Sequence, residues 1–379
     1  MKSILLCAFL LTFSCFSTQL LPPFYSYLNF QDKCTSFLLK EQLCFKNQIS
    51  HPKKIIVFYS DGGGGHKSAW ITLQNCLKDN YNIEGFKIFE EPLACLDPIK
   101  NLTFGYCSCE DFYNTILAGR WTNLVNQLYY FGAERIQSQK EEIETLLSDF
   151  LLQKKPDLVI SVIPLLNGFL ANVTKALELP FLVIPTDLDS TSFIYGLNPP
   201  YSSNFLYSIP FDDNLICDKL LPAEFPLTKT KVIGFPVRQT FFTPKNKQAL
   251  KHEFHVPSDK PVVMILMGAA GSTSSYRYVR KIARMSNPMH LLVCLGRNER
   301  MRYKIEKIRL PEEISMSIIG FTPRIADLMS ISDVLITKAG TVSVCEALHM
   351  HLPMILDNTT GSIIWEGLNL QFIEYYGFG

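Results

Sequence analysis

Short apolar runs alternate with helix-like stretches from residue 53 to the end of the chain. In the first half, KKIIVFYS (53–60) is rich in β-forming residues and ends at the glycine turn DGGGG, and a helix-like stretch, HKSAWITLQNCL, follows. Further apolar runs predict strands at 86–89, 157–163 and 181–186, with a long helix at 135–153. Runs that are apolar throughout are typical of parallel strands covered on both faces. The pattern therefore predicts a doubly wound α/β sheet.

A second series of the same kind begins near residue 260. PVVMILMG predicts a strand, and a glycine turn and a helix follow it in GAAGSTSSYRYVRKIARM. Further strands are predicted at 291–296, 315–321, 334–340 and 352–357. The chain thus divides into two Rossmann-like domains, residues 53–236 and 237–379. Two such domains facing each other across a cleft form the GT-B arrangement of nucleotide-sugar glycosyltransferases, a layout that also fits sugar-nucleotide epimerases.

The amino terminus is apolar without any alternation. Residues 4–22, ILLCAFLLTFSCFSTQLLP, carry no charge, and Lys2 precedes them. This layout is typical of a signal peptide or a signal anchor, and the segment approaches the ~20 residues of a spanning helix. We therefore predict a hydrophobic leader or signal anchor over residues 1–22.

The composition narrows the class of protein. Lysine and arginine number 36 against 35 aspartates and glutamates, so the net charge of +1 gives no basis for nucleic-acid binding. Hydrophobic residues reach 47% and charged ones only 19%, which excludes a disordered chain. The 11 cysteines are scattered, and the pair Cys107 and Cys109 lacks the spacing of a zinc or redox motif. We expect reduced thiols and no metal site.

The first glycine turn carries candidate chemistry. Gly62, Gly63, Gly64 and Gly65 precede His66 at the start of the predicted helix. Successive glycines let backbone N–H groups approach an anion, and the helix N-terminus favours negative charge. His66 is therefore a candidate to bind a phosphate or to contact an acceptor hydroxyl. The turn is not a Walker A loop, because His66 separates the last glycine from the lysine that follows.

Two features of the second half repeat this logic. The turn GAAGSTSS (268–275) offers backbone amides and hydroxyls to a diphosphate. In TKAGTVSVCEA (337–347) a strand is followed by Gly340, and a helix then begins near Thr341 or Ser343. Ligands bind at this edge of such sheets, and Glu346 in the helix is a candidate to accept hydrogen bonds from a ribose diol.

Several stretches occur in the order found in one known family. They are SDGGGGHKSA, VISVIP, PTDLDST (185–191), GFPVR (234–238), ILMGAAG, LVCLGRN (292–298), IIGFTPRIADLM (318–329), ITKAGTVSVCEA and WEGLN (365–369). Over residues 53–379 the chain thus resembles the monogalactosyldiacylglycerol synthases and processive diacylglycerol glucosyltransferases. The peptidoglycan N-acetylglucosaminyltransferase of lipid II synthesis is a more distant relative.

The resemblance implies an inverting, metal-independent transfer of galactose or glucose from a UDP-sugar to diacylglycerol or a related membrane lipid. No cofactor besides the donor is implied. The second domain would hold the donor and the first the acceptor, with His66 and the turn Gly62–Gly65 facing it. The implied donor contacts are Gly268 and Gly271 with Arg238 for the diphosphate, Phe321 and Ile325 around the uracil, Gly340, Thr341 and Ser343 at the phosphate-facing helix, Glu346 at the ribose, and Glu366 and Asn369 at the sugar.

Inversion requires one base to take the proton of the acceptor hydroxyl while that oxygen attacks the anomeric carbon. Glu90 and Glu91 stand where the resembled family often places an acid, after the second strand. His66 is the rival base. The sequence leaves these three residues open as catalytic candidates.

The chain departs from the family at several positions. Ile163 replaces a histidine, Trp365 replaces a glutamine before the sugar-contacting acid, and Val342 replaces a glycine of the helix turn. The stretch DSTSFIY (189–195) lacks the usual histidine and tryptophan. The family continues beyond the region where this chain ends at Gly379, so we expect a shortened second domain.

Two further classes of function stay open. One is an N-acetylglucosaminyltransferase acting on a lipid-linked precursor, or an epimerase of similar layout. The other is a degenerate, non-catalytic binder of nucleotide-sugar or lipid. For a lipid glycosyltransferase we expect membrane association with the catalytic part on the cytoplasmic face, because UDP-sugars are made in the cytosol. The stretch RWTNLVNQLYYFG (120–132) either docks to the bilayer or packs in the core.

Overall fold

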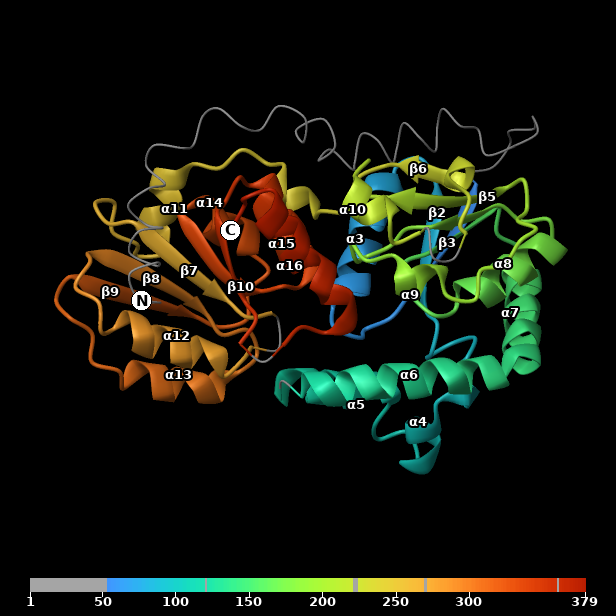
Figure 1. The fold of residues 1–379 in the computed structure, drawn as a ribbon, viewed down its shortest axis with the longest axis horizontal. Coiled ribbons are helices and arrows are strands. Elements are labelled where there is room, and N and C mark those ends of the chain that lie inside the picture. The colour runs from blue at the N-terminus through green and yellow to red at the C-terminus, as the bar shows by residue number, and fades with distance from the viewer. Residues whose placement is uncertain (1–52, 120, 221–223, 269–270, 360) are drawn as a thin grey trace.

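The computed structural model describes residues 53–119, 121–220, 224–268, 271–359 and 361–379. The leader predicted over residues 1–22 lies outside these ranges. The described chain forms two α/β domains, each built on one parallel sheet, that lie side by side (Figure 1). Among the described helices, none is long and apolar enough to cross a membrane.

The first domain contains a six-stranded parallel sheet in the order β2-β1-β3-β4-β5-β6. Its elements are β1 (Lys54–Tyr59), α3 (Gly65–Leu77), β2 (Asn82–Lys87), η3 (Ala94–Leu96), α4 (Pro98–Leu102), α5 (Cys109–Gly119), α6 (Thr122–Ser138), α7 (Lys140–Lys154), β3 (Leu158–Ser161), α8 (Asn167–Ala176), β4 (Phe181–Val183), α9 (Thr191–Ile194), β5 (Phe205–Ile209), α10 (Asn214–Cys217), η5 (Leu227–Lys229) and β6 (Thr230–Val232).

The second domain contains a five-stranded parallel sheet in the order β11-β10-β7-β8-β9. Its elements are η6 (Gln239–Phe241), α11 (Lys247–Glu253), β7 (Val262–Leu266), α12 (Ser274–Ile282), β8 (Met289–Cys294), α13 (Glu299–Glu306), β9 (Ile314–Ile319), α14 (Ile325–Ser330), β10 (Val334–Lys338), α15 (Thr341–His349), β11 (Met354–Asp357), η7 (Ile364–Glu366) and α16 (Gly367–Tyr375).

Burial on both faces explains the continuous apolar runs. Side chains of a strand alternate between the two faces of a sheet. In β1, Ile55 and Val57 belong to one buried cluster, whereas Ile56 and Phe58 belong to another. The second sheet is covered in the same way by two clusters. The predicted architecture of two doubly wound domains is therefore confirmed.

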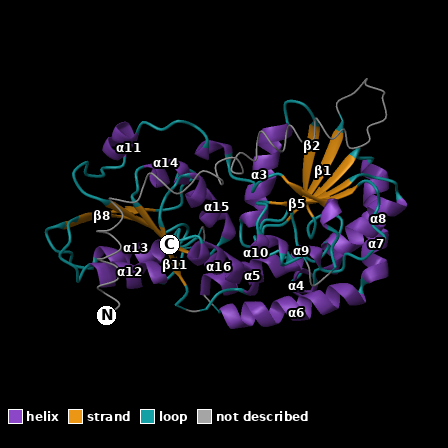
Figure 2. Ribbon diagram, turned by 45° about the horizontal axis from the view of Figure 1, so that its top comes forward, coloured by secondary structure: helices purple, strands orange, loops and turns teal. Residues whose placement is uncertain are grey.

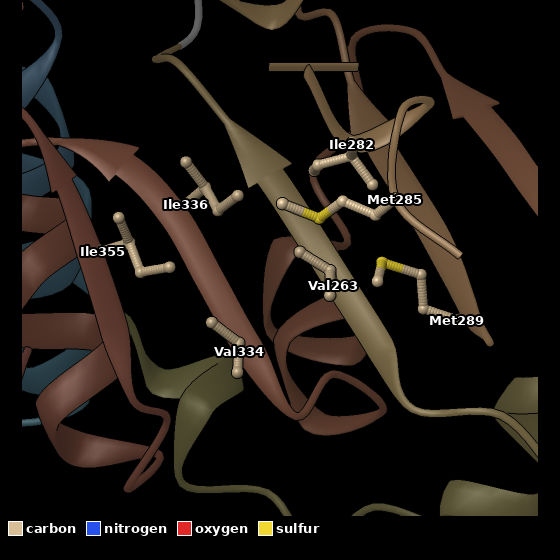
Figure 3. A pocket seen from close by; sticks show the side chains of 7 residues that line it. All are labelled: Val263, Ile282, Met285, Met289, Val334, Ile336 and Ile355. Carbon is tan, nitrogen blue, oxygen red and sulfur yellow. The ribbon is translucent and has the colours of Figure 1, made fainter. Parts of the chain in front are cut away.

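One small cavity lies within the core of the second domain. Figure 3 shows the side chains around it, which are Val263, Ile282, Met285, Met289, Val334, Ile336 and Ile355. Its volume of about 10 Å³ is at the lower limit for one water molecule, and its lining offers no strong hydrogen-bonding group. It is a packing gap beneath the sheet and no candidate for a substrate site.

The long helix predicted at 135–153 is two helices. α6 ends at Ser138 and α7 begins at Lys140, so that the axis bends at Gln139 (Figure 1). The two helices bury their apolar faces against different surfaces. Leu147 of α7 packs into the core of the first sheet, whereas Val125 of α6 packs toward the second domain. Tertiary packing thus divides a stretch that is helical throughout by local pattern.

The helices α5 and α6 extend beneath the contact between the two domains (Figures 1 and 2). Ile116 of α5 and Val125 of α6 form a buried cluster with Ile363 of the second domain. Asn126 Oδ1 accepts a hydrogen bond of 3.1 Å from the backbone N–H of Ile364. The segment α4–α6, which we call the excursion of the first domain, is held against the second domain by these contacts.

Candidate active site between the two domains

The first glycine turn is bound by one face of α5. Asn114 Oδ1 accepts from Gly63 N at 2.9 Å, and Asn114 Nδ2 donates to the carbonyl of Asp61 at 3.1 Å. One helical turn earlier, Glu110 Oε1 accepts from Asp61 N at 3.2 Å. Gly63 and Gly64 have φ values of 72° and 86°, in the left-handed region that glycine adopts without strain. The turn needs its glycines for this path, and α5 fixes it.

His66 follows this turn in the first turn of α3. Its Nδ1 lies 2.7 Å from the carbonyl oxygen of Val162 and 2.9 Å from Thr186 Oγ1. A carbonyl oxygen only accepts, so Nδ1 carries the hydrogen of the neutral ring and Nε2 is left as an acceptor. Burial lowers the pKa of His66 to about 4. The ring is therefore neutral at physiological pH and oriented by backbone.

The structure does not bring Glu90 and Glu91 to His66. Both carboxylates are exposed and follow β2, the edge strand, and Glu90 Oε1 pairs with Lys87 Nζ at 2.9 Å. Val162 follows β3, two strands away in the sheet order. With strands about 4.8 Å apart, this places the two regions on the order of 10 Å from each other.

Glu110 is an acid that the sequence did not indicate. It lies on α5, and burial is the main reason that its pKa is raised to about 7. The ion pair of Asp61 with Lys87, at 2.6 Å, lies beside it. No local sequence pattern distinguishes this glutamate, because its surroundings arise only when α5 packs against the glycine turn.

Among the residues expected to bind the donor, Arg238 and Glu346 are paired. Nε of the guanidinium lies 2.6 Å from Oε1 and Nη2 lies 2.9 Å from Oε2, a bidentate geometry. Burial raises the pKa of Glu346, and Arg238 opposes that rise. The residue expected at the ribose is thus held by the residue expected at the phosphates. A carboxylate has about four acceptor positions, so the pair leaves capacity for a diol.

Four of the expected donor residues lie together at the start of α15. Gly340 is the N-cap, and Asn369 Nδ2 donates to Thr341 Oγ1 at 2.9 Å and to the carbonyl of Ala339 at 2.6 Å. Lys338 Nζ pairs with Glu366 Oε1 at 2.8 Å. An N-terminal helix end with a hydroxyl, an amide and a lysine beside it suits a phosphorylated sugar.

The first domain reaches this same helix end. Thr341 Oγ1 donates to Asp187 Oδ1 at 2.8 Å, across 154 residues of sequence. A Cβ atom at Gly65 would lie 3.6 Å from Val342 Cγ2, so the glycine turn also touches α15. Burial at this contact raises the pKa of Asp187 to about 7, with Thr341 lowering it and Glu366 raising it. Asp187 belongs to the stretch PTDLDST, yet nothing in the sequence assigns it this place.

The remaining residues expected to bind the donor lie at the carboxyl end of the second sheet. Gly268 and Gly271 follow β7 with φ values of 82° and 72°, whereas Phe321 follows β9. Phe321 is 56% exposed, and the guanidinium of Arg297 lies 4.6 Å from the centre of its ring. Ile325 begins α14 and packs on the core, and Ser343 is partly buried in α15. The residues expected at the diphosphate, after β7, and at the uracil, after β9, thus lie at the same end of the second sheet, two strands apart.

No group of three or more histidines, cysteines, aspartates or glutamates within the described ranges is arranged to hold a metal ion. Two parallel-sheet domains that meet at their ligand-binding edges define a GT-B glycosyltransferase fold. In agreement, residues 262–356 match the glycosyltransferase family 28 C-terminal domain.

Known proteins are similar to the chain over most of its length. It is 24% identical over 336 residues to the processive diacylglycerol β-glucosyltransferase of Staphylococcus saprophyticus, with 87% of this chain and 81% of that protein covered. It is 24% identical over 348 residues to the chloroplastic monogalactosyldiacylglycerol synthase of Spinacia oleracea, covering 86% of this chain and 63% of that one. The predicted family resemblance is confirmed.

Two solved structures share the fold. The crystal structure of Acinetobacter baumannii MurG superposes with a TM-score of 0.55 at 13% identity, over 86% of this chain and 84% of that one. The glycotransferase of kitacinnamycin also gives 0.55, at 12% identity, over 87% and 86%. These likenesses confirm the GT-B fold.

Proposed function

We propose that the chain transfers galactose or glucose from a UDP-sugar to diacylglycerol or a related membrane lipid, with inversion at the anomeric carbon. The observation that carries the proposal is the meeting of the glycine turn and Asp187 of the first domain with the N-terminus of α15 in the second. A donor bound at that helix end would have its anomeric carbon facing the acceptor domain. The names of the similar proteins supply the substrates proposed here.

The donor would lie along the edge of the second sheet. Its uracil would stand near Phe321 and Ile325, its ribose near Glu346, and its diphosphate at Gly268, Gly271, Arg238, Gly340, Thr341 and Ser343. Glu366 and Asn369 would contact the sugar. Asn369 and Glu366 are buried and already hydrogen-bonded, so both side chains are preorganised. The UDP-sugar would be the sole co-substrate, without a metal or other cofactor.

The acceptor hydroxyl would approach from Gly62–Gly65 and His66. The neutral ring of His66, with Nε2 free of hydrogen, is suited to accept a hydrogen bond from that hydroxyl. Glu90 and Glu91 are weaker candidates for a base, since they are exposed and one is paired with Lys87. Domain boundaries at 53–236 and 237–379 would separate acceptor and donor binding.

Membrane contact would involve the excursion α4–α6. Its most exposed large apolar side chains are Leu102 (80% exposed), Phe104 (92%), Tyr106 (92%), Trp121 (63%), Tyr130 (60%) and Phe131 (66%). We call this set the aromatic surface. Aromatic and leucine side chains of this kind bury well at a bilayer interface. Because α6 also buries Val125, the stretch 121–132 combines core packing with exposed aromatic side chains. The bilayer leaflet would be cytoplasmic, where the donor is made.

The test is incubation of the full chain with radiolabelled UDP-galactose or UDP-glucose and diacylglycerol in mixed micelles. A labelled lipid that runs as a monohexosyl or oligohexosyl diacylglycerol is the expected product. Absence of labelled lipid with both donors would contradict the proposal. Calorimetric binding of UDP without any turnover would favour the degenerate binder instead.

A further inference from the structure

Asp187 lies where the proposed acceptor side of the first domain contacts the proposed donor side of the second domain. It follows β4 in the first domain, and its Oδ1 accepts from Thr341, the first residue of α15 in the second. The residue before it, Thr186, contacts His66 through its hydroxyl. One loop therefore touches the acceptor-side histidine and the donor-side helix through consecutive side chains.

We propose that Asp187 is the base that takes the proton of the acceptor hydroxyl; this rests on the proposed function. The hydroxyl oxygen forms its bond to the anomeric carbon, and its proton passes to the Asp187 carboxylate. The bond from the anomeric carbon to the diphosphate oxygen breaks, and its electron pair leaves with UDP. The proton later passes to water. Thr341 engages Oδ1, so Oδ2 remains to receive the proton.

The charges around Asp187 suit this role. The ionisable groups near it come from α5, its own loop, β5, β10, α15 and η7, and they are Tyr113, Asp189, Tyr207, Lys338, Cys345 and Glu366. Burial and the two neighbouring carboxylates raise its pKa, while Thr341 and Lys338 lower it, and the result is about 7. A base whose pKa lies near the working pH combines sufficient ionisation with sufficient basicity.

The rival groups are less suited. His66 has a pKa of about 4, which makes it a weaker base at neutral pH, and its ring is positioned to orient the hydroxyl. Glu110 also has a pKa of about 7, but its carboxylate binds Asp61 N beside the edge of the first sheet. Asp187, in contrast to Glu110, accepts a hydrogen bond directly from Thr341 of α15.

Asp187→Asn tests the assignment, because the amide oxygen still accepts from Thr341 while the side chain no longer takes a proton. We expect kcat for glycolipid formation to fall by about 100-fold or more, with UDP affinity by calorimetry unchanged within about threefold. The wild-type rate should fall below about pH 7, and the residual rate of the variant should lose that dependence. The matched control is Asp212→Asn, an exposed acid of the first domain, which should keep the wild-type rate.

Two results would overturn the proposal. One is a variant that keeps more than about one-tenth of the wild-type kcat; the other is a parallel loss of rate and UDP binding, which would make Asp187 a donor-site residue. Slow hydrolysis of the UDP-sugar by water can be followed as UDP release in the absence of lipid. This reaction separates the proposed lipid transfer from the proposed role of Asp187 as the base. If wild-type enzyme makes no glycolipid but hydrolyses the donor, and Asp187→Asn abolishes that, the acceptor assignment fails while the base stands. If wild type does neither, both fail.

Discussion

Arg238 donates two hydrogen bonds to Glu346, from Nε to Oε1 and from Nη2 to Oε2. They join the segment between the domains to the helix α15. Only 2% of the Glu346 side chain is exposed, against 27% of Arg238. The guanidinium also lies 5.2 Å from the centre of the Phe241 ring. The buried carboxylate thus depends on a partner that itself retains contact with solvent.

Removing the two partners should have unequal effects. Arg238→Ala leaves a charge buried without compensation and should lower the free energy of unfolding by about 3 kcal/mol. Glu346→Gln leaves an arginine that is partly exposed and can still reach water, so it should lower the free energy of unfolding by less. Urea unfolding near neutral pH measures both values. The double variant should recover part of the loss of Arg238→Ala, and equal costs for the two single variants would contradict this account.

Trp365 stands where the resembled family has a glutamine, and its ring lies 5.3 Å from that of Tyr129 on α6. This position therefore joins the excursion of the first domain to the second domain. A double-mutant cycle with Trp365→Ala and Tyr129→Ala should give a coupling of about 1 kcal/mol in the free energy of unfolding. A control cycle of Trp365→Ala with Trp121→Ala should be additive, because Trp121 is 63% exposed. Coupling of the same size in both cycles would show that the energy does not come from a specific contact between Trp365 and Tyr129.

The sequence predicted the features that are local. Glycine turns, apolar strands and the helix after Gly340 each have a signature within a few residues, and the structure contains them. The meeting of Asp187 with Thr341 spans 154 residues and has no such signature. The same holds for Glu110, whose carboxylate is defined by the packing of α5 on the glycine turn. The first contact depends on how the two domains sit together and the second on how α5 packs against its own domain, and periodicity encodes neither.

The aromatic surface should bind membranes. Replacing both Phe104 and Phe131 by glutamate should weaken sedimentation with phosphatidylcholine–phosphatidylglycerol vesicles by about tenfold or more, because charge opposes burial in the interface. Both side chains are mostly exposed, so the free energy of unfolding should change by less than about 0.5 kcal/mol per substitution. Tyr303→Glu on α13, 64% exposed in the other domain, is the control and should bind as wild type. An equal loss in the control, or none in the double variant, would exclude docking through this surface.

His66 should make stability depend on pH. Its folded pKa of about 4 lies below the unfolded value of about 6.5, so below pH 6.5 the unfolded chain binds a proton that the fold excludes. The stabilisation is complete above about pH 6.5 and is lost as the pH falls toward 4. His66→Asn keeps a donor for the Val162 carbonyl and removes the titration. Between about pH 7.5 and about pH 5, wild type should lose roughly 2 kcal/mol more than the variant. Parallel losses would show that His66 is protonated in the fold.

Gly271 and Gly64 both have positive φ, but only Gly271 is crowded. A Cβ at Gly271 would lie 2.1 Å from the carbonyl oxygen of Leu295 and 2.7 Å from Asn298 Cβ, whereas nothing lies within 4 Å of one at Gly64. Gly64→Ala should therefore cost only the left-handed backbone strain, about 1–2 kcal/mol. Gly271→Ala adds a displacement of the loop after β7 and should cost at least about 2 kcal/mol more.

The same pair of variants separates the two sides of the candidate site. Because Gly271 belongs to the loop proposed for the diphosphate, its substitution should weaken UDP binding by about tenfold or more in calorimetry, which corresponds to about 1.4 kcal/mol. Gly64→Ala should leave UDP affinity unchanged and instead raise the KM for the lipid acceptor. If Gly64→Ala weakened UDP binding as strongly as Gly271→Ala, the glycine turn of the first domain would also contact the donor, and its assignment to the acceptor alone would be wrong.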